Sequence, residues 1–251
     1  MRLVKKIALV TGAGRGIGKA IALAFAREGA DLVICARREH EILETCKEIQ
    51  SLGQRCLPVK ADVSKEEDVG LMVERALAEF GRIDILVNNA GGSSEPKPVK
   101  DTPFDDWNEV IAANLTGTFL CSKAVIPFMM EQKKGSIINL SSGMGKKGRP
   151  NRGPYCAAKF GIEGFTQVLA LELEEFGIAV NALAPSGLVA TERLKEKAYE
   201  ELKRGGRILE PREVAEAAVF LATKDAKEMG GVTFDVAQWL LEKNAIKPPS
   251  P

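Results

Sequence analysis

Tyr155 and Lys159 stand four residues apart in the segment Tyr155-Cys156-Ala157-Ala158-Lys159, which is predicted to be helical. Residues at this spacing project from one face of a helix, so a phenol and an ammonium are expected to lie together. A neighbouring cation favours tyrosinate and is expected to lower the pKa of the phenol from its usual value near ~10. The pair can then act as a general acid/base, although surface helices also carry Tyr and Lys at this spacing.

A glycine-rich turn follows the first predicted strand. It reads Thr11-Gly12-Ala13-Gly14-Arg15-Gly16-Ile17-Gly18 and leads directly into a helix pattern. Glycines in such a turn permit a tight bend and a close approach of backbone N–H groups to a pyrophosphate at the positive end of the helix. The spacing of Gly12, Gly16 and Gly18, G-x-x-x-G-x-G, therefore predicts dinucleotide binding rather than a purely structural turn.

The second predicted strand ends at Ala36 and continues as Arg37-Arg38, with no Asp or Glu to bind the ribose 2′-hydroxyl of NAD. Arg37 and Arg38, with Arg15 from the glycine turn, offer guanidinium groups that match a 2′-phosphate. This pattern predicts NADP (NADPH) as the cofactor in preference to NAD. The alternative is that Arg37 and Arg38 only begin a solvated helix.

Short apolar runs rich in Val and Ile alternate with amphipathic helix patterns along the whole chain. The predicted strands are 6–12, 31–37, 55–61, 83–90, 135–142, 178–185 and 231–236, and the predicted helices include 17–29, 39–53, 66–81, about 104–132 and 154–177. This alternation predicts an α/β fold with a doubly wound, Rossmann-like parallel sheet of seven strands and helices on both faces. At 251 residues, one domain spanning 1–251 is expected, with a frayed tail at 245–251.

Composition narrows the class of protein. The formal net charge is +1, which provides no bulk field for nucleic acid or an anionic membrane, and no apolar run approaches the ~20 residues of a membrane helix. Five cysteines without a C-x-x-C pair indicate reduced packing residues, and the single histidine, His40, supports no metal site. We therefore expect a cytoplasmic protein with no nucleic-acid partner, no membrane contact and no metal.

Six motifs in one order make the chain resemble the short-chain dehydrogenase/reductase family from end to end, nearest in pattern to its 3-oxoacyl-[acyl-carrier-protein] reductases. They are the glycine turn, Asp62-Val63, Asn88-Asn89-Ala90-Gly91, Asn114 in AANLTG, Ser142 after IINLS, and Tyr155 with Lys159. The resemblance implies an NADP(H)-dependent oxidoreductase of homotetrameric assembly that transfers hydride between the nicotinamide and a carbonyl or secondary alcohol.

The same resemblance assigns roles to individual residues. The cofactor-binding set comprises Gly12, Arg15, Gly16, Ile17, Gly18, Arg37, Arg38, Asp62, Val63, Asn89, Ala90, Gly91, Tyr155, Lys159, Pro185 and Thr191. Within it Asp62 and Val63 would contact the adenine, and Lys159 would hold the nicotinamide ribose. Among the catalytic residues Tyr155 would exchange the proton, Ser142 would hydrogen-bond the substrate oxygen, and Asn114 would hold a relaying water.

Local alternatives remain for Asn88, Asn89, Asn114 and Ser142. Asn88 and its neighbours, like Asn114, are also suited to stabilising turns and strand ends. Ser141 is a rival for Ser142, but Ser142 lies thirteen residues before Tyr155, as the family pattern requires.

Two stretches depart from the family pattern. Most relatives carry a threonine five residues after the proline equivalent to Pro185. In this chain the threonine, Thr191, comes six residues after Pro185. The final strand lacks the usual Asp-Gly-Gly and continues as 234–239, FDVAQW. The assignment of Thr191 to the nicotinamide carboxamide, and the shape of the subunit contact, depend on these segments.

The substrate is the most open part of the prediction. Residues 190–210 are either a substrate lid or a solvated helix pair. The cations Lys146, Lys147, Arg149 and Arg152 near the catalytic serine indicate an anionic substrate, a cofactor phosphate or an acidic acyl carrier protein, whereas Glu172, Glu174 and Glu175 place acid where carrier reductases tend to have a basic docking residue. We expect reduction of a 3-oxoacyl thioester, with sugar or polyol dehydrogenation as the alternative and a non-catalytic NADP-binding sensor as a third.

Small residues in the predicted helix 154–177 indicate how subunits associate. Ala157, Ala158, Gly161 and Gly164 permit close approach of another helix. Relatives pair these helices across a two-fold axis, so a homotetramer or at least a dimer is expected.

Overall fold

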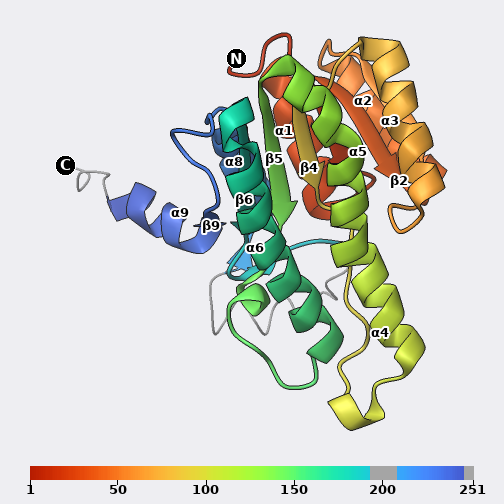
Figure 1. Ribbon diagram of the computed structural model, residues 1–251, viewed down its shortest axis with the longest axis vertical. Coiled ribbons are helices and arrows are strands. Elements are labelled where there is room, and N and C mark those ends of the chain that lie inside the picture. Colours follow the sequence, from red (N-terminus) through yellow and green to blue (C-terminus); the bar gives the residue numbers. More distant parts are fainter. Residues whose placement is uncertain (193–207, 246–251) are drawn as a thin grey trace.

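The computed structural model describes residues 1–192 and 208–245 and contains one central parallel sheet (Figure 1). Its strands are β1 (Ile7–Thr11), β2 (Asp31–Ala36), β3 (Cys56–Lys60), β4 (Ile85–Asn88), β5 (Gly135–Leu140), β6 (Ile178–Ala184) and β9 (Thr233–Asp235). They lie in the order β3-β2-β1-β4-β5-β6-β9, and every neighbouring pair is parallel. The predicted seven-stranded, doubly wound sheet in a single domain is confirmed.

Helices cover both faces of this sheet. The helices are α1 (Gly16–Arg27), α2 (Glu39–Ser51), α3 (Glu66–Phe80), α4 (Phe104–Ile111), α5 (Gly117–Gln132), α6 (Gly153–Leu173), α8 (Pro211–Ala222) and α9 (Val236–Ala245). One core cluster joins α1, α2 and α8 to the sheet, and a second joins α3, α5 and α6 to its other face. Figure 1 shows α5 and α6 crossing in front of the strands.

The strand sequences explain why both faces are covered. In β1, Ala8 and Val10 enter the first core cluster, whereas Ile7 and Leu9 enter the second. Side chains alternate between the faces of a strand, so a continuous apolar run requires helices on both sides. All five residues of β1 are buried.

The sheet reverses its winding between β1 and β4. From β1 the chain builds outward through β2 and β3, and it then returns to place β4, β5 and β6 on the other side. In open α/β sheets, ligands bind beyond the carboxyl ends of the strands at such a switch point. Thr11, Asn88 and Leu140 end their strands at this edge.

The long helical segment from Phe104 to Gln132 is interrupted. Residues Ala112–Thr116 form a π-helical turn between α4 and α5, and Asn114 lies at its centre. By length and a mean hydropathy of 1.3 this segment could cross a membrane, a test that core helices also pass. Its α5 half supplies Leu120, Cys121, Val125 and Met129 to the second core cluster, so it serves as a covering helix here.

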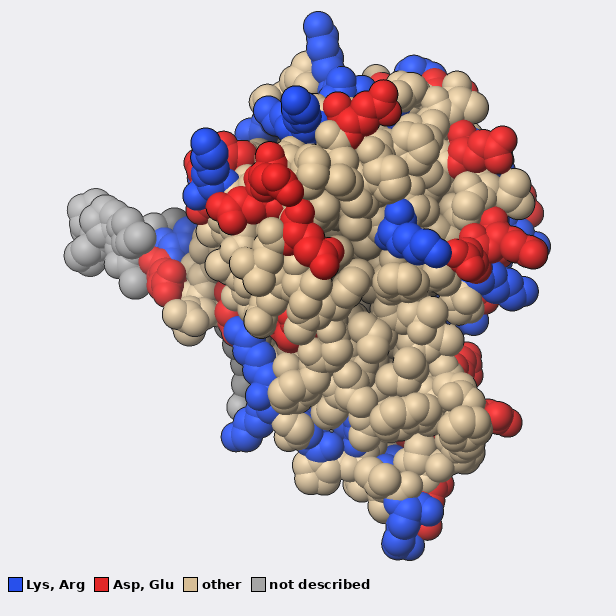
Figure 2. All heavy atoms as spheres, viewed as in Figure 1, with Lys and Arg blue, Asp and Glu red and all other residues tan. Residues whose placement is uncertain are grey.

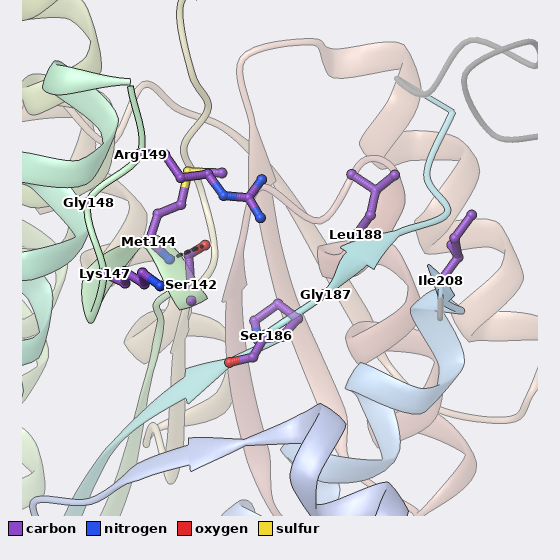
Figure 3. Close-up of a pocket in the computed structure, with 11 residues that line it drawn as sticks. Ser142, Met144, Lys147, Gly148, Arg149, Ser186, Gly187, Leu188 and Ile208 are labelled. Atoms are coloured by element: carbon purple, nitrogen blue, oxygen red, sulfur yellow. Dashed lines mark hydrogen bonds between the residues drawn. The ribbon is translucent and has the colours of Figure 1, made fainter. Parts of the chain in front are cut away.

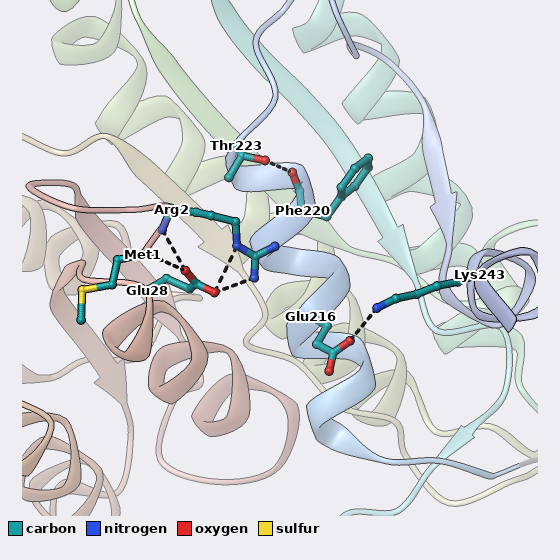
Figure 4. A network of polar contacts seen from close by, with 7 residues as sticks. All are labelled: Met1, Arg2, Glu28, Glu216, Phe220, Thr223 and Lys243. Atoms are coloured by element: carbon teal, nitrogen blue, oxygen red, sulfur yellow. Dashed lines mark hydrogen bonds and ion pairs between the residues drawn. The ribbon is translucent and has the colours of Figure 1, made fainter. Parts of the chain in front are cut away.

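The C-terminal part contains elements that the sequence prediction did not name. They are α8, α9 and a two-stranded sheet formed by β7 (Leu188–Val189) and β8 (Ile208–Leu209). Lys243 Nζ of α9 lies 3.2 Å from Glu216 Oε2 of α8, while Arg2 Nη2 lies 2.6 Å from Glu28 Oε1 and holds the N-terminus to the end of α1 (Figure 4). Most of the predicted lid, 193–207, and the tail beyond 245 lie outside the described residues.

Candidate functional site

The glycine turn forms a backbone cradle at the start of α1. Gly12 and Gly16 have φ of +65° and +57°, and a β-carbon on Gly18 would lie 2.3 Å from Asn89 Nδ2 and Gly12 O. Arg15 at the N-cap makes no side-chain cap hydrogen bond, and the first turn of α1 contains no acidic residue. An uncapped, positive helix end approached by glycine backbone fits the pyrophosphate of a dinucleotide.

Asn89 anchors this turn to β4. Its Nδ2 donates to Thr11 O at 2.8 Å and to Gly12 O at 3.1 Å, while the backbone N–H groups of Asn89 and Ala90 donate to Thr11 Oγ1 at 3.0 Å. Asn88 instead points into the buried interior, where its Nδ2 donates to Ser122 Oγ and Asn139 Oδ1. Asn88 therefore stabilises the scaffold, and Asn89 shapes the cofactor cradle.

The arginines expected to bind a 2′-phosphate are partly engaged. Arg38 Nε lies 3.0 Å from Glu41 Oε1, and Arg15 Nη1 lies 4.0 Å from the same oxygen. Glu41 also lies against Gly14, because a β-carbon there would be 2.9 Å from its Oε2. The sequence prediction missed Glu41, which lies a few residues beyond the end of β2 in the first turn of α2. Both guanidinium groups thus converge on one point beside the glycine turn.

Asp62 and Val63 follow β3 at the same edge of the sheet. Asp62 Oδ1 accepts hydrogen bonds from Ser64 N at 3.1 Å and Ser64 Oγ at 2.7 Å. Burial opposes ionisation of Asp62, but these hydrogen bonds and the charges of Arg37 and Lys65 outweigh it and hold its pKa below the usual value. Val63 is buried, and a β-carbon on Gly117 would lie 2.6 Å from its Cγ2. Asp62 is therefore an ionised acceptor, and Val63 packs the wall behind it.

Asn114 is fully buried and holds an unsatisfied acceptor. Its Nδ2 donates to Gly92 O and Val110 O, both at 2.8 Å, while its Oδ1 has no hydrogen-bond partner among the described residues. A β-carbon on Gly91 would lie 2.3 Å from this Oδ1. A π-helical turn contains one residue more than an α-helical turn, and such turns are frequent at functional sites. The buried acceptor fits a small polar ligand such as water.

Ser142 and Tyr155 interact across the carboxyl edge of β5. Ser142 Oγ accepts a hydrogen bond from Met144 N at 3.2 Å, and the Ser142 side chain lies close enough to the Tyr155 phenol to lower its pKa. Burial raises the pKa of Tyr155, whereas the Ser142 side chain and the charge of Arg152 lower it, and the net shift is upward. The expected downward shift is therefore wrong in direction, and Arg152 rather than Lys159 is the cation that opposes burial.

Lys159 is buried on the turn of α6 after Tyr155. Its Nζ donates to Leu140 O at 2.7 Å and lies 5.4 Å from the centroid of the Tyr155 ring, so the ammonium is directed at the end of β5. Burial lowers the pKa of Lys159 from 10.5 to about 8, and the charge of Glu163 opposes this shift. A lysine with such a pKa exchanges its proton near neutral pH.

Glu163 is a buried carboxylate that the sequence prediction missed. It is 8% exposed and accepts hydrogen bonds from Ser141 Oγ and Thr233 Oγ1. It thereby links α6 to the ends of β5 and β9. Its position four residues after Lys159, on the same helix face, is the signal that would have identified it. Ser141, the rival of Ser142, is committed to this carboxylate.

A cavity of about 470 Å³ opens beside Ser142 (Figure 3). It is lined by Ser142, Gly143, Met144, Lys147, Gly148, Arg149, Pro185, Ser186, Gly187, Leu188 and Ile208. Thr191 lies on the cofactor side, because a β-carbon on Gly16 would be 3.4 Å from its Cγ2. The cavity lies between the segment after β6 and the loop that joins β5 to α6.

Among the predicted site residues, Ser142 and Pro185 line this cavity. Tyr155 and Lys159 in α6 and Asn114 in the π-turn are not among its lining residues. Arg37, Arg38 and Asp62 lie at the β2 and β3 side of the same sheet edge. Such an arrangement suits hydride transfer coupled to proton transfer.

Comparisons with known proteins agree with this geometry. The family model described as short chain dehydrogenase matches residues 6–202. A 3-oxoacyl-[acyl-carrier-protein] reductase of Synechocystis sp. is 41% identical over 239 residues, which cover 93% of this chain and 96% of the relative. The (2S)-[(R)-hydroxy(phenyl)methyl]succinyl-CoA dehydrogenase subunit BbsD of Thauera aromatica is 39% identical, covering 90% and 92%.

Solved structures agree as well. The crystal structure of levodione reductase has a TM-score of 0.88 and 30% identity to this chain, and the match covers 94% of this chain and 98% of that protein. The predicted resemblance in fold is confirmed over nearly the whole chain.

Proposed function

The chain belongs to the short-chain dehydrogenase family, and we propose that it is an NADP(H)-dependent oxidoreductase that interconverts the carbonyl and the secondary alcohol of an acyl thioester. The observation that carries this proposal is the position of Ser142 on the wall of the cavity, with the Tyr155 phenol close enough for its pKa to respond to the serine side chain. The third candidate, a non-catalytic sensor, has no support here, since Asn114, Ser142, Tyr155 and Lys159 are all present.

The chain's own side chains supply the proton chemistry. The nicotinamide ring, when bound, supplies or accepts the hydride. Tyr155 gives its phenolic proton to the substrate oxygen in the reductive direction and takes it back in the oxidative direction. The Ser142 hydroxyl donates a hydrogen bond to the same oxygen, where negative charge develops. The charge of Arg152 favours the tyrosinate, the buried Lys159 ammonium returns a proton to it, and Asn114 Oδ1 holds a water that connects Lys159 to solvent.

Selection of NADP(H) over NAD(H) follows from the charges around β2. Ala36 ends this strand without a carboxylate for the free ribose hydroxyl, and Arg37 is exposed beside it. Arg15 and Arg38 converge on Glu41, so a 2′-phosphate competes with this carboxylate for the two guanidinium groups. Three guanidinium groups face two carboxylates, Glu41 and Asp62, and this excess of positive charge favours the phosphate.

A thioester substrate is supported by two relatives and by the basic loop. The Synechocystis relative is named for an acyl-carrier-protein substrate, and the Thauera relative for a coenzyme A thioester. Lys147 and Arg149 line the cavity mouth and suit an acidic carrier or nucleotide. Glu172 is acidic where carrier reductases tend to have a basic docking residue. It lies seventeen residues after Tyr155, about 25 Å along α6 at 1.5 Å per residue. Within one subunit it therefore does not repel a ligand at the cavity.

A paired-substrate assay tests this proposal. NADPH oxidation is followed by absorbance with a 3-oxoacyl thioester on an acyl carrier protein, a small neutral ketone, and a panel of ketoses, each at low and high salt. We expect turnover of the thioester, falling with salt as exposed charge is screened beyond ~10 Å, and little salt effect with the ketone. Turnover of ketoses without the thioester would replace this proposal with the sugar or polyol alternative.

We also propose that subunits pair through α5 and α6. Their outer surface exposes large apolar side chains, at 44% for Phe119, 45% for Phe160, 50% for Val168 and 79% for Leu171. Figure 2 shows a broad area without charged side chains over these helices. Exposed apolar area of this kind is typical of protein interfaces, which supports a homotetramer or at least a dimer.

A further inference from the structure

The cations near the catalytic serine do not share one environment. Lys147 and Arg149 line the cavity next to Ser142. Arg152 instead donates to Ser93 Oγ and Ser94 O at 3.4 Å and acts on the Tyr155 phenol, and it does not line the cavity. A surface that only attracts a carrier protein would not require Lys147 and Arg149 to line the cavity. Their position there lets them contact the acyl part of the substrate itself.

Arg149 is directed into the cavity rather than across the surface. Figure 3 shows its guanidinium extended into the space between the Ser142 and Leu188 sides, with the Lys147 ammonium near Ser142. Within residues 1–192 and 208–245, no carboxylate forms an ion pair with Arg149 or Lys147. None of the residues that line the cavity is acidic. The two positive charges therefore lack an internal counter-ion in the described part of the chain.

The other residues that line the cavity strengthen the attraction of these charges for an anion. Met144, Leu188 and Ile208 are apolar, and glycines at 143, 148 and 187 add no polar side chain. An apolar wall lowers the local dielectric and strengthens attraction between the guanidinium and an anion. A guanidinium offers paired donors in a plane, which match the two oxygens of a carboxylate or phosphate.

We propose that Arg149, assisted by Lys147, forms an anion subsite inside the substrate pocket for a carboxylate or phosphate that the substrate carries beside its reacting carbonyl. The reacting oxygen contacts Ser142 and Tyr155, and the anionic group contacts Arg149. This inference rests on the proposed oxidoreductase function and narrows its substrate from acyl thioesters in general to those that carry such an anionic group. Arg149 sets specificity here and takes no part in the proton transfer.

Matched pairs of probes test the subsite. Reduction by NADPH and binding by titration calorimetry are measured for acetoacetate against methyl acetoacetate, and for dihydroxyacetone phosphate against dihydroxyacetone. The protein variants are wild type, Arg149→Met, Arg149→Lys and Arg75→Met, the last an exposed arginine on α3 that serves as the matched control. The first pair reports on a carboxylate and the second on a phosphate.

We expect wild type to prefer the anionic member of one pair in binding or in kcat/KM, and Arg149→Met to lower that preference by ~10-fold or more. Arg149→Lys should retain part of it, because the charge remains without the planar donors. Arg75→Met should leave it unchanged. Equal binding of both members by wild type, or equal losses in the Arg149 and Arg75 variants, would overturn the subsite.

Two further outcomes separate this proposal from neighbouring ones. If Arg149→Met spares both pairs yet slows an acyl-carrier thioester, the cation acts on the carrier and the subsite is overturned. If wild type and Arg149→Met reduce neutral ketones at the same rate without any anionic preference, the oxidoreductase function stands and only the subsite fails. Loss of the function itself would show as no NADPH oxidation with any carbonyl compound.

Discussion

Glu163 lies one helical turn beyond Lys159 on α6, and its charge opposes the effect of burial on the pKa of the lysine ammonium. The carboxylate is held by the hydroxyl groups of Ser141, which follows β5 next to Ser142, and of Thr233 in β9. Glu163 does not contact the cavity, so we regard it as a positioning residue. It keeps Lys159 charged and fixes the end of β5 against α6.

This relationship predicts a shift in the pH profile of Glu163→Gln. Lys159 is charged below its pKa of about 8, so activity should fall as the pH rises through that value. Removal of the Glu163 charge lowers this pKa further, and the alkaline limb of kcat/KM should move to lower pH.

Thr233→Val is the matched control for that variant, because it removes a hydrogen bond to Glu163 but retains the carboxylate charge. The alkaline limb of its kcat/KM profile should lie at the same pH as in wild type. An identical shift in both variants would assign Glu163 a purely structural role.

Ser142→Ala and Ser141→Ala distinguish the two neighbouring serines. Ser142 lines the cavity and lowers the pKa of Tyr155, whereas Ser141 hydrogen-bonds buried Glu163. We expect kcat to fall by ~10²-fold or more in Ser142→Ala, as for the loss of a preorganised donor. Ser141→Ala should lose much less. Steady-state kinetics with both variants checks this order, and a larger loss in Ser141→Ala would reverse the assignment.

Cofactor preference should respond to Ala36 and Glu41 in opposite directions. Ala36→Asp adds a carboxylate for the free ribose hydroxyl and should shift preference toward NADH. Glu41→Gln releases Arg15 and Arg38 from their shared carboxylate and should tighten NADPH binding. Glu39→Gln, in the same turn of α2, is the control. Dissociation constants for both cofactors provide the measurement, and tighter binding of NADH by wild type would contradict NADP selectivity.

The apolar face of α6 predicts the assembly. Leu171→Glu places a charge at a side chain that is 79% exposed in the single subunit, and it should dissociate the oligomer if this face is an interface. Leu43→Glu, on α2 of the opposite layer, should leave the assembly intact. Light scattering gives the masses. Wild-type protein with a mass of only 27.1 kDa would contradict the proposed pairing.

The strands, and the sheet edge at which the site residues lie, were predictable because both depend on local sequence patterns. Continuous apolar runs such as 7–11 must be buried on both faces, and carboxyl ends of parallel strands meet at one edge. The C-terminal helices were missed, although Pro211 at the first helical position with Glu210 and Glu213 around it is a helix-start signal. The apolar patterns of α8 and α9 extend over only 12 and 10 residues, and the prediction did not use the capping residues.

The pKa of Tyr155 was not predictable from spacing alone. The Tyr155–Lys159 interval identifies the same helix face, but it does not reveal that the Lys159 ammonium turns toward Leu140 O. Burial of the phenol and the approach of Arg152 depend on the tertiary fold. In the same way the contacts of Glu41 with Arg15, and of Glu163 with Ser141 and Thr233, join different elements and depend on the tertiary fold.

The most direct test of the account is the Tyr155→Phe variant, because the proposed reaction exchanges a proton at this phenol in both directions. The variant removes only the hydroxyl, so NADPH should bind nearly as it does to wild type in a fluorescence titration. Turnover with a reducible thioester or ketone should fall by ~10²-fold or more, as expected for loss of a general acid/base. Turnover close to the wild-type rate would remove Tyr155 from the mechanism and contradict the central claim.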